Sequence, residues 1–382
     1  MTKLHDLYEQ QGQSPWIDNI RRAALRDGTL ARQVSQGIRG VTSNPTIFAK
    51  AIEGGSDYDE QFSALLADHS VEEAYWDMTI DDIVDALEIL RPVHEASDGT
   101  DGWVSIEVAP ALAHDTAATI EAARRLHELI ARPNLYVKIP GTAEGIGAVR
   151  AMIAEGRSIN VTLLFSVERH GEVIEAYLAG LEDHLASGAS DLSGVHSVAS
   201  FFVSRVDTEV DRRIEQMADG AAGSKSGGEL LSLRGKAAVA QARVAYQLFE
   251  ERFRGPRWEA LAAKGARVQR PLWASTSTKN PAYPDLAYVD TLIGPDTVNT
   301  MPDQTVEAFL DHGTVARTVD SDPRGAKRVL ELLGEAGIDM DDVARTLEDE
   351  GVASFTKSFD EVLQVLTDKA SALAAGTRGS KT

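Results

Sequence analysis

The sequence predicts an α/β protein built on a (β/α)₈ barrel, with additional helices that include a C-terminal extension. Short apolar runs rich in β-branched residues alternate with longer stretches of helical composition, which is typical of parallel strands buried on both faces. Eight such runs occur, and eight units of this kind close most economically into a barrel. With 382 residues, 43% of them hydrophobic, the chain can bury the core of one large barrel domain.

The eight apolar runs are the expected strands. They cover residues 15–20, 38–42, 103–109, 135–140, 158–165, 195–203, 270–276 and 297–301. The stretches between them carry helical patterns. In residues 114–131, apolar residues at near-helical spacing alternate with charged ones, so this helix would cover the barrel wall.

Several segments exceed the minimal strand and helix units. Residues 71–96 form an acidic helical insertion, and the glycine-rich residues 219–228 are expected to form a mobile loop. Residues 323–370 are expected to form C-terminal helices that pack on the barrel, and residues 371–382 a flexible tail. None of these segments interrupts the strand count, so residues 1–382 are predicted to be a single barrel domain.

The composition limits the functions that the chain can have. It contains no cysteine, which excludes a disulfide framework, a thiolate nucleophile and a cysteine metal site, and makes the cytoplasm the natural compartment. The formal net charge of −21 would repel nucleic acid and anionic membranes. No apolar stretch approaches the length of a bilayer span, so we expect a soluble protein with no membrane partner.

Lys138 is the most informative polar residue, because it stands between Val137 and Ile139 in an expected buried strand. Burying an ammonium group is costly unless the group is paired or neutralised. Two interpretations remain open. Lys138 either forms a salt bridge or reaches solvent at the end of its strand, or it is the nucleophile of a Schiff base, since burial frees the lone pair of an amine to attack a carbonyl.

Other polar residues fall near the ends of the expected strands, where barrels place their active sites. Asp18 lies in the first run, Asn44 follows the second, and Glu107 is inside the third. In the fifth run, the period of two places Asn160 and Thr162 on one face, which would point into the barrel. Such groups either satisfy each other internally or, beside a buried lysine, move protons at a carbinolamine.

The later strands supply candidate binding residues. Ser200 and Phe202 share one face of the sixth run, and Arg205 breaks that alternation, so we expect it in the following loop. Arg205 and Lys279 could together hold a phosphate at the mouth of the barrel. The alternative for each cation is an ordinary surface salt bridge.

The usual cofactor and metal motifs are missing from the sequence. No GxGxxG follows an expected strand, and the segment GSKS at 223–226 lacks the spacing of a phosphate-cradling loop. The nine histidines form no HExxH or comparable pair, and no GxSxG elbow occurs. The sequence therefore predicts chemistry without a nucleotide cofactor, a metal or an acyl-enzyme.

Taken together, five blocks of sequence resemble the transaldolase family. In chain order they are GVTSNPT at 40–46, SIEV at 105–108, YVKIP at 136–140, NVTLLFS at 160–166 and SFFVSR at 200–205. The resemblance is collinear from about Asp18 to Pro302. The length and the C-terminal helices look like the longer bacterial branch of the family.

The resemblance implies a class I aldolase-like barrel that needs no cofactor. Such a transferase moves a dihydroxyacetone unit from sedoheptulose 7-phosphate or fructose 6-phosphate to glyceraldehyde 3-phosphate or erythrose 4-phosphate, in the non-oxidative pentose phosphate pathway. By the same resemblance, Lys138 would form the imine, and Glu107 with Thr162 would activate the water that handles its protons. Asp18 would take the proton of the donor's C4 hydroxyl.

The resemblance also implies the binding residues. Asn44, Asn160 and Ser200 would hydrogen-bond the dihydroxyacetone moiety, Phe202 would wall the pocket, and Arg205 would bind the phosphate. The second phosphate-binding arginine of shorter family members is replaced here by Lys279, which lacks the bidentate fork of arginine. Phosphate affinity, and not the reaction, depends on that change.

Two alternatives remain at this point. A fructose-6-phosphate aldolase would use the same lysine but release free dihydroxyacetone; such relatives are much shorter and carry Gln at the position of Glu107 and Tyr at that of Phe202. A non-catalytic barrel that binds sugar phosphates is the other, although degenerate members normally lose the reactive residues first. The expected partners are sugar phosphates, and the chain would be a monomer or a homodimer.

Overall fold

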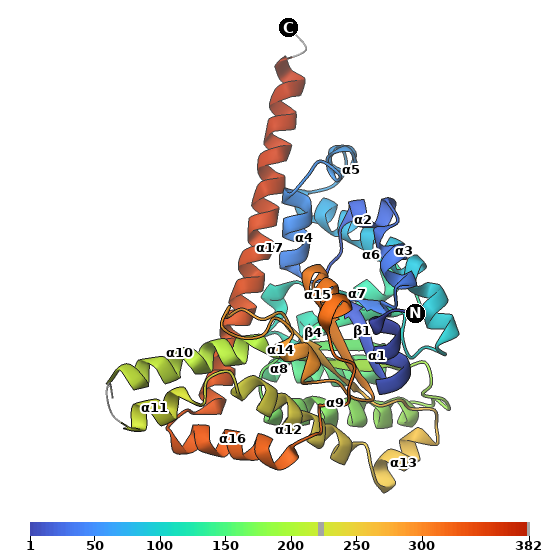
Figure 1. Cartoon of the computed structure of the whole chain (residues 1–382). Coiled ribbons are helices and arrows are strands. Elements are labelled where there is room, and N and C mark those ends of the chain that lie inside the picture. The colour runs from blue at the N-terminus through green and yellow to red at the C-terminus, as the bar shows by residue number, and fades with distance from the viewer. Residues whose placement is uncertain (221–224, 380–382) are drawn as a thin grey trace.

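The strands close into a parallel barrel, which confirms the predicted fold class (Figure 1). The computed structural model describes residues 1–220 and 225–379. Neighbouring strands pair in chain order, and the last strand pairs with the first. Their bounds are β1 (Gln13–Ile17), β2 (Gly40–Val41), β3 (Trp103–Glu107), β4 (Leu135–Pro140), β5 (Ile159–Leu164), β6 (Ser197–Phe202), β7 (Arg270–Ala274) and β8 (Thr297–Met301).

Helices surround this barrel. Before β6 they are α1 (Lys3–Gln11), α2 (Arg22–Arg26), α3 (Thr29–Ser35), α4 (Pro45–Glu53), α5 (Asp59–Leu65), α6 (Val71–Ala96), the 3₁₀ helix η1 (Pro110–Leu112), α7 (Thr116–Ile130), α8 (Ala143–Ala154) and α9 (Val167–Ala186). After β6 they are α10 (Ser204–Gly220), α11 (Lys225–Leu231), α12 (Ala237–Arg252), α13 (Pro256–Ala262), α14 (Ala287–Asp290), α15 (Asp303–His312), α16 (Pro323–Glu335) and α17 (Met340–Gly379).

The second strand is shorter than predicted at both ends, and a helix start just beyond it accounts for its C-terminal end. The strand consists of Gly40 and Val41: Val41 pairs with both β1 and β3, and Gly40 pairs with β3. Asn44 then caps α4 by accepting a hydrogen bond from the backbone N–H of Ile47, and Pro45 occupies the first helical position. Because proline has no N–H and its fixed φ suits a helix start, the chain leaves the sheet here.

Aromatic side chains fill the lower part of the barrel, at the N-terminal ends of the strands. The rings of Trp103 and Tyr136 stack at 4.1 Å between centroids, and Trp16 lies 6.2 Å from Tyr136. Gly40 makes room for this packing, because a Cβ atom at this position would lie 2.4 Å from the Trp16 ring. The barrel is therefore a packed core below its active end.

Replacing Gly40 with alanine should destabilise the protein by about 1–3 kcal/mol, because the added methyl group overpacks the core against Trp16. Gly194→Ala is the matched control, since a Cβ atom there would meet nothing within 4 Å. Urea unfolding followed by tryptophan fluorescence measures both variants. Equal midpoints for the two would contradict the packing described.

A buried ionic network lies at the same lower end. Asp101, which precedes β3, accepts hydrogen bonds from Ser14 (2.8 Å), Trp16 (3.2 Å), Arg39 (2.7 Å) and Arg270 (3.1 Å). Asp101 is fully buried and Arg270 is nearly so. The network joins β1, β7 and the segments that enter β2 and β3.

The two longest helices are α6 and α17. Helix α6 lies beside β3, and helix α17 lies at the upper rim of the barrel. The acidic insertion predicted at 71–96 is helix α6, which begins with a capping box between Ser70 and Glu73. Helix α17 contacts α4, α6, α10, η1 and β5, and its outer end projects beyond the other helices (Figure 1). Gly351 lets α17 approach β5 closely, since a Cβ atom there would lie 3.0 Å from the Leu163 side chain.

The helical structure differs from the prediction at two places. Helix α17 continues to Gly379, so the tail expected from residue 371 is helical as far as that residue; the last three residues lie outside the described part. Of the loop expected at 219–228, Asp219 and Gly220 belong to α10 and residues 225–228 to α11, and residues 221–224 are outside the described part. Within residues 1–220 and 225–379, no helix has both the length and the apolar character needed to cross a bilayer.

Candidate active site

The barrel register places Glu107, Lys138 and Asn160 side by side on β3, β4 and β5. Glu107 pairs with Lys138, and Lys138 pairs with Asn160. Paired residues of a parallel sheet project to the same face, so all three side chains point into the barrel, and each is buried. Glu107 is the last residue of β3, and the row therefore lies toward the end where barrels build active sites.

Two oxygen atoms from neighbouring segments hold the Lys138 side chain. Its Nζ donates a 3.0 Å hydrogen bond to the carbonyl of Ser43 and lies 3.1 Å from Oε2 of Glu107. Lys138 is 4% exposed, so the idea that it reaches solvent is wrong, whereas the salt bridge is present. A buried ion pair recovers its desolvation cost only partly, so its presence calls for a reason other than stability.

The Glu107 carboxyl group is poorly satisfied. Burial raises its pKa, the positive charge of Lys138 lowers it in part, and the negative charge of Asp18 raises it further. Neither carboxylate oxygen accepts a well-aligned hydrogen bond from the described residues, although Oε2 lies close to Lys138. Buried carboxyl groups left without partners are uncommon and are typical of sites that move protons.

Asp18 lies one residue beyond β1 and faces the same region. Its Oδ1 accepts a 2.7 Å hydrogen bond from the hydroxyl of Thr42, which is itself 2.6 Å from the hydroxyl of Thr300. Burial raises the pKa of Asp18, while the Thr42 hydrogen bond and the charges of Lys138 and Lys279 lower it. Asp18 thus shares an electrostatic environment with Lys138.

Thr162 sits at an irregularity in β5. The register with β6 shifts between Val161 and Leu164, and Leu163 has a φ of +59°. A β-bulge of this kind re-aims the neighbouring side chain, and a non-glycine residue in this region carries local strain. The Thr162 hydroxyl is fully buried and has no hydrogen-bond partner among the described residues.

Asn160 is held by side chains on β3 and β6. Its Nδ2 donates 3.1 Å to the Ser105 hydroxyl, and its Oδ1 accepts 2.7 Å from the Ser200 hydroxyl. Ser200 is therefore in direct contact with Asn160, as expected of neighbouring inward positions. Asn44 is half-buried, and because its Oδ1 caps α4 its Nδ2 group remains to donate to a ligand.

The structure corrects the position predicted for Arg205. It lies in the first turn of α10 and not in a loop, because α10 begins at Ser204, directly after β6. Its guanidinium carbon lies 5.6 Å from the centre of the Phe202 ring, which packs against Phe165 at 5.2 Å. Among the described residues, Arg205 forms no ion pair and no hydrogen bond through its side chain, so the surface salt-bridge interpretation is wrong here.

Lys279 lies on the long segment after β7 and is exposed. Its Nζ donates 2.5 Å to the Ser277 hydroxyl. Partial burial lowers the pKa of Lys279 and the charge of Arg205 lowers it further, which places the two cations within electrostatic range of each other. No ion pair of Lys279 occurs in the described part of the chain.

Two residues in this site were not singled out from the sequence. The carbonyl of Ser43 binds Lys138, and the Thr42 hydroxyl orients Asp18. Both belong to the block at 40–46, and the signal available was their place at the end of a strand. Among the described residues, no group of three His, Asp or Glu side chains is placed to hold a metal ion.

The chain matches the protein-family model described as Transaldolase/Fructose-6-phosphate aldolase over residues 15–366. The chain belongs to this family.

Individual relatives agree with the family assignment. The transaldolase of Acidothermus cellulolyticus is 52% identical over 359 residues, which cover 93% of this chain and 94% of that protein. The transaldolase of Thermobifida fusca is 52% identical over 355 residues, 92% and 94% of the two chains. That of Mycolicibacterium smegmatis is 50% identical over 355 residues, 92% and 93%. The predicted family and the predicted enzyme type, a transaldolase, are confirmed.

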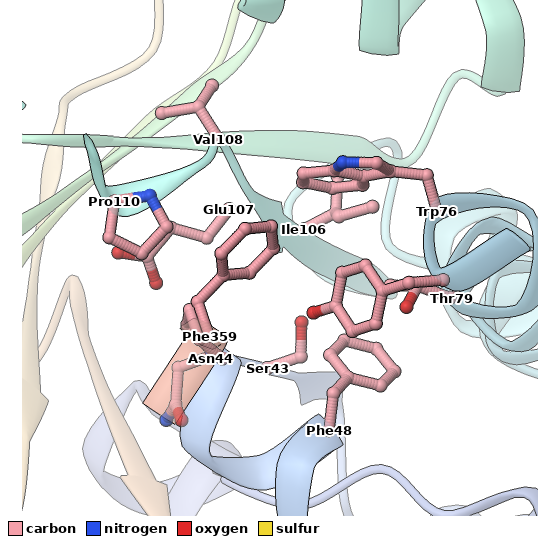
Figure 2. Close-up of a pocket in the computed structure, with 12 residues that line it drawn as sticks. Ser43, Asn44, Phe48, Trp76, Thr79, Ile106, Glu107, Val108, Pro110 and Phe359 are labelled. Atoms are coloured by element: carbon pink, nitrogen blue, oxygen red, sulfur yellow. The ribbon is translucent and has the colours of Figure 1, made fainter. Parts of the chain in front are cut away.

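In this member of the transaldolase family, helices α6 and α17 cover the barrel beside Glu107. A cavity of about 10 Å³ lies there, and Figure 2 shows Glu107, Asn44 and Phe359 around it. Phe359 comes from α17 and packs edge-on against Tyr75 of α6, with ring centroids 5.3 Å apart. These aromatic rings keep water from the carboxyl group, which accounts for the raised pKa of Glu107.

The pH dependence of turnover should reflect this burial. Because the pKa of Glu107 is raised, the base form is lost as the pH falls, at a higher pH than for an exposed glutamate. Asp18 titrates with it, so the acid limb should depend on two protons. In Glu107→Gln, turnover should fall by about 10²–10⁴-fold. The acid limb of its pH profile should depend on one proton fewer than that of the wild type.

The matched control for this prediction is Glu95→Gln, a change at an exposed glutamate of α6. The control should keep the wild-type pH profile. An unchanged acid limb in Glu107→Gln would show that this carboxyl group does not control the rate.

Proposed function

We propose that the chain transfers a dihydroxyacetone unit between sugar phosphates through an imine on Lys138. The observation that carries the proposal is a lysine buried in the barrel and paired with a buried carboxylate, whose second oxygen, Oε1, has no hydrogen-bond partner among the described residues. Sedoheptulose 7-phosphate or fructose 6-phosphate is the donor. Glyceraldehyde 3-phosphate or erythrose 4-phosphate is the acceptor.

In the first step, the neutral amine of Lys138 attacks the C2 carbonyl of the ketose. The carbinolamine loses water to give the imine, and protons move between the amine, the carbinolamine oxygen and a bound water. Glu107 and Thr162 hold and activate that water, because Oε1 of Glu107 and the Thr162 hydroxyl are buried and have no hydrogen-bond partner among the described residues. The proton that leaves the Lys138 ammonium passes to the Glu107 carboxylate 3.1 Å away, so both groups become neutral.

In the second step, the C3–C4 bond breaks. Asp18 takes the proton of the C4 hydroxyl, the aldehyde product leaves, and the electron pair of the broken bond enters the protonated imine to form an enamine. The enamine then attacks the aldehyde of the acceptor, and Asp18 returns the proton to the new C4 hydroxyl. Water finally adds to the product imine, which releases the new ketose and frees the amine of Lys138. The Thr42 hydrogen bond keeps the carboxyl group of Asp18 oriented for both transfers.

Binding residues surround this centre. Asn44, Asn160 and Ser200 hydrogen-bond the three-carbon unit, and Phe202 forms the wall of the pocket. Arg205 binds the phosphate with Lys279 beside it, since neither cation is neutralised by an acidic partner among the described residues. An acidic protein needs such local cations, because its net charge of −21 repels the substrate elsewhere.

The family also contains fructose-6-phosphate aldolases, and the products distinguish the two reactions. Incubation with fructose 6-phosphate and erythrose 4-phosphate should form sedoheptulose 7-phosphate and glyceraldehyde 3-phosphate in equal amounts. Release of free dihydroxyacetone at a comparable rate would overturn the proposal in favour of the aldolase. Absence of both products would favour the non-catalytic alternative.

We also propose that the chain works in the non-oxidative pentose phosphate pathway, in the cytoplasm, without a cofactor. The lack of cysteine supports the compartment. A monomer or a homodimer fits a substrate site built entirely from one chain.

A further inference from the structure

Helix α10 presents one face to the segment that carries Lys279. Asp207 and Asp211 follow Ser204 by three and seven residues along the helix, which places all three on a single face. All three are buried. We call them the tether face. Arg205 follows Ser204 directly and therefore projects from a different side of the same helix turn.

The segment that follows β7, residues 275–288, contacts the tether face first at its own beginning. The backbone N–H of Ser204 donates 3.1 Å to the carbonyl of Ser275, and the two hydroxyl groups lie 2.9 Å apart. Ser275 has a φ of +56°, so the chain turns sharply here at a residue that is not glycine. This contact joins the start of α10 to the start of the segment.

The two carboxylates of the tether face each bind a tyrosine near the end of this segment. Asp207 accepts 2.8 Å from the hydroxyl of Tyr288 and 2.8 Å from the N–H of Ala238. Asp211 accepts 2.5 Å from the hydroxyl of Tyr283 and 2.9 Å from the N–H of Gly235. Each carboxylate thus accepts a hydrogen bond from one tyrosine of the segment and one from a backbone N–H at or just before the start of α12.

Close packing supports the second contact. Gly235 has a φ of +67°, and a Cβ atom there would lie 2.8 Å from the Tyr283 ring. Glycine is required both for this backbone conformation and for the approach of the ring. Burial raises the pKa of Asp207 to about 6, so near neutral pH it is the carboxylate that accepts both hydrogen bonds.

The segment between these contacts is itself closed. Thr278 donates to the carbonyls of Pro284 (2.8 Å) and Asp285 (3.1 Å), and the N–H of Tyr283 donates 3.1 Å to the carbonyl of Asn280. Lys279 lies inside this closed loop, four residues before Tyr283. Its backbone position is therefore determined by the tether face.

We propose that the tether face sets the separation of Arg205 and Lys279, so that Tyr283 and Tyr288 are positioning residues for the phosphate of the substrate. The inference rests on the proposed function, because it takes the two cations as the phosphate ligands. It adds a reason why a lysine serves at position 279. Because the loop that carries Lys279 is closed and anchored, it can hold the lysine ammonium in place although a lysine lacks the bidentate geometry of an arginine.

The test uses Tyr283→Phe, Tyr288→Phe and the double variant. Tyr283 is only half-buried, so its variant should fold even if the buried change at Tyr288 does not. In the double variant, the KM for fructose 6-phosphate and the Ki for inorganic phosphate should both rise roughly tenfold, as for loss of a hydrogen bond to a charged group. The kcat should stay within about twofold, because Lys138 and Glu107 are untouched.

Tyr177→Phe is the matched control, since it also removes the hydroxyl of a buried tyrosine, here one that donates to the carbonyls of Arg267 and Val195. It should leave both constants unchanged. The proposal that the tether face positions the two cations would be overturned if the KM and the phosphate Ki of the double variant did not change. Equal changes in the control would also overturn it. So would a fall in kcat without a rise in KM.

Failure of the underlying function gives a different result. Borohydride reduction with fructose 6-phosphate reports on the imine at Lys138 in every variant. If the adduct forms in every variant while the KM and the phosphate Ki stay unchanged, only the proposed role of the tether face is wrong. If even the wild-type protein forms no adduct, the proposed function fails first.

Discussion

Lys138→Met should reduce the rate of dihydroxyacetone transfer on the order of 10⁴-fold or more, because the imine cannot form without the amine. Methionine keeps much of the volume of the side chain, so the barrel should still fold. The measurement is turnover with fructose 6-phosphate and erythrose 4-phosphate. Residual activity within tenfold of wild type would mean that the reaction does not pass through this lysine.

Removal of the Lys138 ammonium has a second consequence. Glu107 loses the positive charge that lies 3.1 Å from its Oε2, so its raised pKa should rise further and the group should stay protonated. Lys264→Met serves as the control, since it removes the same charge from an exposed position. That variant should keep wild-type turnover.

Asp101→Ala should destabilise the protein by about 3–5 kcal/mol, because it leaves the buried Arg270 without its counter-charge. The hydrogen bonds from Ser14, Trp16 and Arg39 to this carboxylate are lost as well. The network lies at the lower end of the barrel, so the change should act on folding and not on chemistry. Urea unfolding and steady-state kinetics on the folded fraction separate the two effects.

The control for this prediction is Asp98→Ala. Asp98 also pairs with an arginine, Arg267, but its side chain is 93% exposed. Exposed pairs contribute about 0–1 kcal/mol, so the loss should be small. Similar losses for Asp98→Ala and Asp101→Ala would contradict the role given to burial.

Much of the fold could be predicted from local pattern. Buried parallel strands read as continuous apolar runs, and eight such runs predicted eight strands whose positions are correct to within a few residues. The α6 insertion was predicted with the bounds that it has. Errors occurred at strand ends, as at β2, where capping by Asn44 and the proline that follows it ended the strand early.

Part of the proposed catalytic centre could also be predicted from the sequence. A lysine between Val137 and Ile139 is conspicuous in an apolar strand, and the alternation of Asn160 and Thr162 indicated their shared direction. What the sequence did not show depends on contacts between distant segments. Ser43 meets Lys138 across 95 positions of sequence, and no local pattern reports that distance.

The same limit applies to strain and to the binding residues. Nothing in β5 indicates that Leu163 has a positive φ, because leucine rarely adopts that conformation. Arg205 was expected in a loop because it breaks the strand alternation, yet the chain passes directly from β6 into α10. The tyrosines that anchor the Lys279 loop lie far from α10 in sequence and become visible only in the fold.

The most direct test of the central claim is to trap the imine. The protein is incubated with fructose 6-phosphate, reduced with borohydride, digested and mapped by mass spectrometry, with a known transaldolase labelled in parallel. A dihydroxyacetone-sized adduct on Lys138 is the result that the proposal predicts. An unmodified Lys138, or an adduct on another lysine while the parallel enzyme is labelled, would contradict it.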